Sequence, residues 1–226
     1  VYDRMVKREG DPAAPTLLLG YDNTPIQAEK ALYDLAQWCR SRPGLAAYLA
    51  DTPTAQLVDD LDREQAPEGS LPEDWREWQG RSRQYLDKYG YSIYDLDFSK
   101  PLPMEDPTPI FKVIKMYLAG QGSNPHERQR AFADRREAAA QAMTHRLRGL
   151  KLKIFRKVLG WAQWLAPLRE DGIADLGLGY PKIRRMLLEL GRRLAEARAI
   201  EIAGDVFWLL RDEVAEASKA LDQGDV

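Results

Sequence analysis

Three arginines in the second half of the chain have side chains that could hold a phosphate group. Arg169 follows a short Ala-Pro-Leu segment, and Arg184 and Arg185 are adjacent further along. A guanidinium group can donate two parallel N–H bonds to phosphate, which an ammonium cannot. Arg169, Arg184 and Arg185 could each pair with phosphate in this way, and ordinary surface or interhelical ion pairs are the other interpretation of these residues.

Aromatic side chains gather between residues 75 and 98. Four of them recur at helical spacing, which favours a packed core over a ligand pocket; they are Trp75, Trp78, Tyr85 and Tyr89. Three more follow in a stretch without helical period, and ordered loops of this kind often carry binding. Tyr91, Tyr94 and Phe98 are therefore candidate ligand residues.

Metal chemistry and nucleophilic catalysis find no support in the remaining residue types. The two histidines, His126 and His145, and the single cysteine stand at none of the spacings typical of zinc ligands. Cys39 falls on the apolar face of a predicted helix, which indicates a core position. The chain also lacks a GxxxxGK[ST] loop and any Gly-Gly pair. We expect no metal site, no catalytic residue and no cofactor in this chain.

The charge pattern separates the two halves of the chain. Residues 1–107 carry 12 Lys and Arg against 20 Asp and Glu, whereas Arg128 to Lys157 contains ten Lys and Arg against Asp134 and Glu137. Such a basic run can bind phosphates or anionic ligands, or it can be a solvated face balanced by the acidic half. Because the pI is near 5.9 and no nucleic-acid motif is present, we do not expect nucleic-acid binding. We expect no membrane span, and one cysteine fits a reducing cytoplasm.

Helical periodicity predicts an all-α fold. Asn23-Thr24-Pro25 and Asn124-Pro125 are start signals, with an N-cap side chain and an early proline. We expect shorter helices in residues 1–106 and, in residues 107–226, a long antiparallel helix hairpin with a C-terminal segment, the two parts forming one integrated domain. The first long helix carries an apolar stripe that we expect to be buried: Leu147, Leu150, Ile154, Val158, Trp161 and Leu165.

The C-terminal part of the sequence predicts a second buried stripe, a close approach of another element at Gly191, and a segment with buried aromatic side chains. The stripe includes Ile183, Met186, Leu190 and Leu194. Gly191 in mid-helix indicates that another element comes close there. The segment Asp205-Val206-Phe207-Trp208-Leu209 is expected to bury its two aromatic side chains.

Several ordered motifs resemble one enzyme family. They are Tyr89-Gly90 with Asp97, Pro101 and Glu105-Asp106-Pro107; Ala166-Pro167-Leu168-Arg169-Glu170; Arg184 to Leu194; and Gly204-Asp205-Val206-Phe207-Trp208-Leu209 with Glu213. In this order they resemble the central helical region of phosphoenolpyruvate-utilising enzymes, which include phosphoenolpyruvate synthase and rifampin phosphotransferase. The resemblance covers about Leu17 to Glu213, and Tyr91-Ser92 replaces the His-Arg pair of many members.

The resemblance implies a helical domain from a multidomain phosphotransferase or kinase. Members combine an ATP-grasp module, a swivelling domain with a phosphorylated histidine, and an acceptor-binding region. This chain has neither a Gly-Gly nor a Ser-His pair, so it lacks the phosphohistidine motif. It would bind a small-molecule acceptor, contact the other two domains of its parent and be inert alone, while ATP and Mg serve the parent. In such a domain, Arg169, Arg184 and Arg185 would be candidate phosphate or docking contacts. An initial Val rather than Met favours a fragment.

The alternative is a free-standing helical interaction protein derived from the same region. Only the flanking reading frame would separate it from a fragment of a larger enzyme. Neither interpretation names the acceptor.

Overall fold

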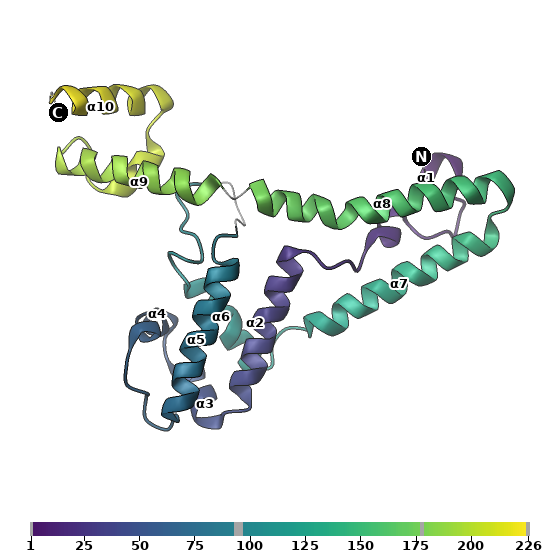
Figure 1. Cartoon of the computed structure of the whole chain (residues 1–226), viewed down its shortest axis with the longest axis horizontal. Coiled ribbons are helices and arrows are strands. Elements are labelled where there is room, and N and C mark those ends of the chain that lie inside the picture. The colour runs from purple at the N-terminus through teal and green to yellow at the C-terminus, as the bar shows by residue number, and fades with distance from the viewer. Residues whose placement is uncertain (1, 93–96, 177–178, 225–226) are drawn as a thin grey trace. The chain divides into compact units, whose positions relative to one another are not determined.

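The computed structural model describes residues 2–92, 97–176 and 179–224, and these residues fold into α-helices and short 3-10 helices without a strand among them (Figure 1). The predicted all-α class is confirmed. The elements are α1 (Tyr2–Met5), η1 (Ala14–Leu18), α2 (Thr24–Arg40), α3 (Pro43–Asp51), α4 (Thr54–Asp59), η2 (Asp60–Asp62), α5 (Pro72–Tyr89), α6 (Thr108–Leu118), α7 (Pro125–Arg146), α8 (Gly149–Leu176), α9 (Tyr180–Glu196), η4 (Ala203–Trp208) and α10 (Arg211–Gln223).

The chain forms two compact units. Unit 1 comprises residues 1–85 and 108–173, and unit 2 comprises residues 86–107 and 174–226. The boundaries fall inside α5 and α8. Each unit combines two separate stretches of the sequence. The predicted boundary between residues 1–106 and 107–226 is a boundary along the sequence, and it stays a prediction. The antiparallel pairing of α8 with α9 also stays a prediction.

One part of unit 1 is a bundle of α2 to α6 around two tryptophans. Trp75 and Trp78 are fully buried and stack with 4.7 Å between their ring centroids, and Phe111 of α6 lies 5.8 Å from Trp78. The core positions predicted for Trp75, Trp78, Tyr85 and Tyr89 are confirmed. Cys39 of α2 is buried as predicted, and burial raises the pKa of its thiol to about 12.

The other part of unit 1 consists of α7 and α8 with the N-terminal residues packed on them. Met143 of α7 and Leu147, which directly follows this helix, share a core with Phe155 of α8 and Leu17 of η1. Figure 1 shows α7 and α8 leaving their connecting turn next to one another, with α1 at the same end. Both predicted helix starts are confirmed, because the Asn23 and Asn124 side chains accept from the backbone N–H groups of Ile26 and His126.

The single long helix predicted after Asn124 is interrupted. α7 ends at Arg146, Leu147 has extended backbone angles, and α8 begins at Gly149 with φ +56°. Leu147 is buried in the core below the turn, so burial of this side chain competes with helix continuation. Glycine then allows the chain to reverse, because it adopts positive φ without a Cβ clash.

The apolar stripe predicted to be buried on α8 is exposed instead. Leu147 is buried, but the other members of the stripe are not, and the side chains that α8 turns toward the core are Phe155, Leu152 and Leu159. The exposed large apolar residues of α8 are Leu150, Ile154, Val158, Trp161, Trp164, Leu165 and Leu168. Periodicity identified a row of apolar residues along α8. Because apolar residues also occupy other sides of this helix, periodicity could not tell which side faces the core.

In unit 2 the buried face of α9 differs in part from the predicted stripe, of which Leu194 is buried as predicted. Met186 is 72% exposed and Ile183 is exposed, whereas Tyr180, Arg184, Gly191 and Leu194 are buried. The close approach predicted at Gly191 is confirmed. Its partner is η4, because a Cβ added at Gly191 would overlap the carbonyl oxygen of Ala203.

The segment Asp205–Leu209 buries an aliphatic side chain rather than two aromatic ones. Val206 is buried under α9, Phe207 is half-buried and Trp208 is 78% exposed. A 3-10 helix places neighbouring side chains about a third of a turn apart, so Val206, Phe207 and Trp208 cannot all point to the same face.

We predict that Gly191→Ala destabilises unit 2 while Gly160→Ala, also in mid-helix, does not destabilise unit 1. The added methyl group at Gly191 must displace the backbone of η4, at a cost of about 2 kcal/mol. At Gly160 it meets open space and should stabilise α8 by about 0.5–1 kcal/mol. Hydrogen exchange of α9 and chemical unfolding measure both effects.

Labelling of Cys39 by a thiol reagent is the control, since this residue reports on unit 1 alone. The thiol should stay protected in Gly191→Ala. Faster labelling of Cys39 in that variant, or unchanged exchange in α9, would contradict the prediction.

Candidate functional site

A short stretch of backbone crosses α7 and α8 and is held there by their side chains. We call residues 17–21 the crossing segment. Three side chains donate hydrogen bonds to alternate carbonyl oxygens of this segment: Gln163 Nε2 to Leu17 (3.1 Å), Arg136 Nη1 to Leu19 (2.8 Å) and Gln129 Nε2 to Tyr21 (2.5 Å). These bonds satisfy backbone acceptors that no helix or sheet would otherwise pair.

Both ends of the N-terminal region are anchored as well. Arg146 of α7 donates to the Val6 carbonyl (2.9 Å) and to the Asp11 carboxylate (2.6 Å). The Tyr2 hydroxyl donates to the Pro12 carbonyl (2.8 Å), and burial raises the pKa of this hydroxyl above its usual value, with the Asp11 charge adding to the effect. Further on, Thr24 donates through both N and Oγ1 to the Asp171 carboxylate at 3.0 Å.

Gly20 lets the crossing segment lie directly on α7. It has φ +76°, and a Cβ added there would overlap the backbone of Phe132 and Ala133. Only glycine combines this left-handed conformation with the absence of a side chain. The position therefore fixes how closely the segment approaches the helix.

The crossing segment, α7 and α8 enclose a pocket in unit 1 with a volume of about 760 Å³. We call it the large pocket. Its walls are mostly apolar, with a few polar side chains, and its lining comprises Ala14, Pro15, Leu18, Leu19, Gly20, Tyr21, Asn23, Ile26, Gln129, Phe132, Ala162, Leu165, Ala166, Pro167 and Arg169. A site of this size with apolar walls and a few polar groups is typical of small-molecule binding.

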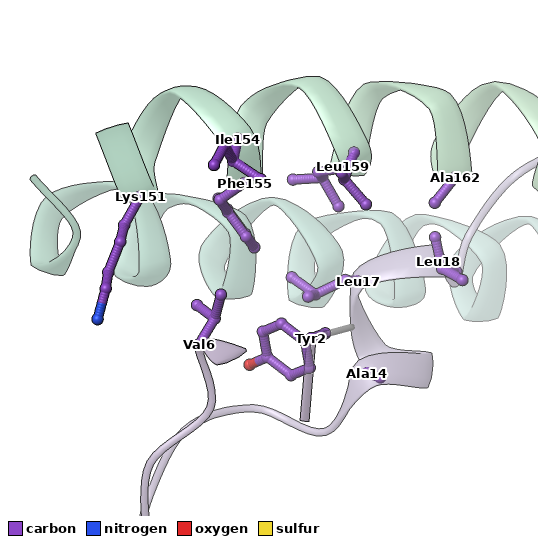
Figure 2. A pocket seen from close by; sticks show the side chains of 11 residues that line it. Tyr2, Val6, Ala14, Leu17, Leu18, Lys151, Ile154, Phe155, Leu159 and Ala162 are labelled. Atoms are coloured by element: carbon purple, nitrogen blue, oxygen red, sulfur yellow. The ribbon is translucent and has the colours of Figure 1, made fainter. Parts of the chain in front are cut away.

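A second, smaller pocket of about 140 Å³ adjoins it. We call it the small pocket, and Figure 2 shows the side chains of α8 facing those of α1 and η1 across it. Ala14, Leu18 and Ala162 line both pockets, so the two meet where η1 crosses α8.

Several polar groups that line the large pocket also bind other parts of unit 1. Asn23 caps α2 and Gln129 holds the Tyr21 carbonyl. The Arg136 guanidinium lies 4.0 Å from the Tyr21 ring centroid; burial raises the pKa of the Tyr21 hydroxyl, and the Arg136 charge opposes that rise. Arg169 also lines the large pocket, and its side chain is exposed.

Two of the other residues predicted from the sequence come together in unit 2. The buried Arg184 side chain is 8% exposed; its Nε donates to Glu105 at 2.7 Å and its Nη1 donates to the carbonyl of Phe98. The Phe98 ring stacks on Tyr180 with 4.2 Å between centroids. Arg184 thus joins the 98–105 loop to α9, and its guanidinium also lies 5.1 Å from the Phe207 ring centroid.

The remaining predicted residues do not join that cluster. Arg185 is exposed and lines a shallow hollow on α9 with Lys182, Met186 and Glu189. Hydrogen bonds from Arg192 and Arg193 lower the pKa of Glu189 to about 2. Tyr91 is exposed, and Tyr94 lies outside the described residues.

Of the residues predicted from the sequence as site candidates, Arg169 lines the large pocket, and the other lining residues are not among those candidates. Residues 1–22 have no helical period, so periodicity gives no prediction for them. The run Leu17-Leu18-Leu19 followed by Gly20 was the available signal, because three leucines before a glycine indicate a buried, tightly turned segment.

Neither a metal site nor a membrane-spanning helix is found among the described residues. Among those residues, no group of three His, Cys, Asp or Glu side chains lies close enough together to hold a metal ion. No helix in the described parts of the chain is both long and apolar enough to cross a bilayer.

We predict that Arg184→Met destabilises unit 2 by about 2 kcal/mol, because it leaves Glu105 and the Phe98 carbonyl without their donor. Arg185→Met is the matched control and should change the free energy of unfolding by less than about 0.5 kcal/mol. Urea unfolding followed by circular dichroism compares the two variants. Equal effects would contradict a structural role specific to Arg184.

We predict that Gly20→Ala loosens the crossing segment more than Gly10→Ala does. Both glycines have positive φ, at +76° and +84°, but a methyl group at Gly10 meets no atom within 4 Å. Gly10→Ala should therefore cost about 1 kcal/mol from the backbone alone, and Gly20→Ala about 3 kcal/mol because α7 must also move. Amide exchange at residues 17–21 separates the two effects, and equal exchange would refute the close approach.

Comparison with known proteins places most of unit 1 in one family. The family model described as the rifampicin phosphotransferase fourth domain matches residues 2–170. This stretch contains the crossing segment, α7 and almost all of the α8 surface that lines both pockets.

A curated relative is the chondramide synthase cmdD of Chondromyces crocatus, which is 23% identical over 223 residues. The match covers 96% of this chain but 5% of that protein, so the chain corresponds to a small part of a much longer relative. Because the family model covers well over half of the residues, the chain belongs to the rifampicin phosphotransferase fourth-domain family.

Proposed function

We propose that this chain is the acceptor-binding and linking helical domain of a phosphotransferase-type enzyme, and that the acceptor binds in the large pocket. The observation that carries the proposal is the pocket of about 760 Å³ inside the region that matches the family. The domain would hold the acceptor while chemistry takes place on residues supplied by other parts of the parent protein.

The lining of the pocket supports an acceptor that is bulky and mostly apolar. Leu18, Phe132 and Leu165 supply apolar surface, and removal of such surface from water drives binding. Arg169 could contact a phosphoryl group as it reaches the acceptor, because a guanidinium pairs well with phosphate oxygens. In this proposal the pocket positions the acceptor, and the reacting groups come from other parts of the parent protein.

The rest of the reaction would come from partner domains of the parent. An ATP-grasp module using ATP and Mg would phosphorylate a histidine on a swivelling domain, and that histidine would deliver the phosphoryl group. The exposed apolar stripe on α8 supports contact with further protein, because contiguous exposed apolar surface usually marks an interaction site. A cytoplasmic location would suit this use of ATP.

The same stripe supports the second candidate, a free-standing helical interaction protein. In that case the α8 stripe would be the functional surface and the large pocket would have no ligand. The two candidates therefore differ in whether a small molecule binds in the pocket.

We predict that the amphipathic dye 8-anilinonaphthalene-1-sulfonate binds the chain at a saturable site and that Ala166→Trp weakens this binding. Ala166 lines only the large pocket, so a Trp side chain there would fill it. The dissociation constant should rise about tenfold, equivalent to about 1.4 kcal/mol. Dye fluorescence measures the binding.

Ala138→Trp on the exposed face of α7 is the matched control and should leave the dissociation constant within about twofold. Rifampicin serves as competitor, and displacement of the dye would support an acceptor of that class. If Ala166→Trp leaves the dissociation constant of the dye unchanged, the dye does not bind in the large pocket. That result would favour the second candidate, a free-standing helical interaction protein.

A further inference from the structure

The small pocket offers a ligand few groups with which to form a hydrogen bond. Apolar side chains make up its lining except for Tyr2 and Lys151. The Tyr2 hydroxyl already donates to the Pro12 carbonyl, and Figure 2 shows the Lys151 ammonium directed away from Leu17 and Leu159. A polar group placed there would lose its bonds to water without replacement, which costs free energy.

The volume of the small pocket matches a single aromatic ring. An apolar cavity of about 150 Å³ lined by Leu, Ile and Phe holds benzene. The small pocket has about 140 Å³ and is lined by the same residue types, including Leu17, Ile154, Phe155 and Leu159.

Apolar surface at the mouth of the pocket remains in contact with water. Leu18, Ile154 and Val158 are 36%, 41% and 37% exposed. An apolar group that enters would cover these side chains, and each Å² removed from water contributes about 25 cal/mol. Because the pocket opens along this side, a ligand can enter without unfolding the N-terminal region.

We propose that the small pocket is a subsite for a benzene-sized apolar group, an aryl ring or a short branched alkyl group, carried by the acceptor. The larger body of the same acceptor would lie in the large pocket, because Ala14, Leu18 and Ala162 line both pockets. This inference rests on the proposed function, which assigns the acceptor to the large pocket. It adds the chemical class: an acceptor with an apolar arm next to a larger polar-edged body.

Toluene tests the subsite directly, with methyl resonances of Leu17, Val158 and Leu159 as the readout. We expect saturable shifts with a dissociation constant on the order of 1 mM. Val158→Phe should weaken binding about tenfold by filling the small pocket, which it lines without lining the large one. Leu150→Phe is the control on the same helix; it lies outside both pockets and should leave toluene binding unchanged.

A pair of dyes tests whether the subsite serves the ligand of the large pocket. The anilino dye carries a phenyl ring that 8-aminonaphthalene-1-sulfonate lacks. The anilino dye should bind about tenfold more tightly to the native chain, and Val158→Phe should remove this advantage. Ala166→Trp should weaken both dyes and leave toluene binding intact.

The outcomes separate the two proposals. Toluene that does not bind, or binds equally well to Val158→Phe, overturns the subsite. Equal affinity of the two dyes overturns its link to the acceptor. Dye binding that is insensitive to Ala166→Trp overturns the proposed function even where toluene binds as expected. Cys39 labelling verifies that each variant is folded, and Ile154→Phe replaces Val158→Phe if that variant fails this check.

Discussion

The large pocket depends on hydrogen bonds from side chains to the backbone of the crossing segment. Without Gln129, Arg136 and Gln163, the carbonyl groups of residues 17–21 would have to face water, and the segment would leave α7 and α8. Each such bond contributes about 1 kcal/mol. Their importance lies in placement, because they hold an irregular segment at a fixed distance from two helices. Gly20 sets that distance by allowing contact between the two backbones.

Unit 2 uses a different device for the same purpose. There a single buried cation, Arg184, holds the 98–105 loop against α9 through Glu105 and a backbone carbonyl. Removal of this cation from water costs free energy, and the hydrogen bonds to its partners offset that cost. In both units an irregular segment is therefore fixed by polar groups from a regular helix, and the apolar residues fill the space between them.

Much of the fold could be predicted from local sequence signals. Asn23 and Asn124 start their helices because a side-chain oxygen accepts from the first free N–H groups, and this requires no knowledge of distant residues. Cys39 and Gly191 were also assigned correctly, Cys39 from the apolar face of its helix and Gly191 from its position in mid-helix.

The walls of the site were harder to predict, because they depend on which elements meet. The apolar surface of α8 is wider than one buried face needs, so periodicity alone could not separate core residues such as Phe155 from exposed ones such as Trp161. The break at Leu147 and the course of residues 17–21 follow from packing in three dimensions. Arg169 was selected because it belongs to the Ala166–Glu170 motif that resembles the enzyme family, and its role as a ligand residue stays a prediction.

The bonds that hold the crossing segment bind its carbonyl oxygens and not its side chains. Leu18, Leu19 and Tyr21 can therefore be exchanged in evolution without detaching the wall of the pocket, provided that Gly20 and the three donors remain. Related chains could acquire different ligand preferences by single substitutions at these positions. The position of the crossing segment and the ligand preference of the pocket would then depend on different residues.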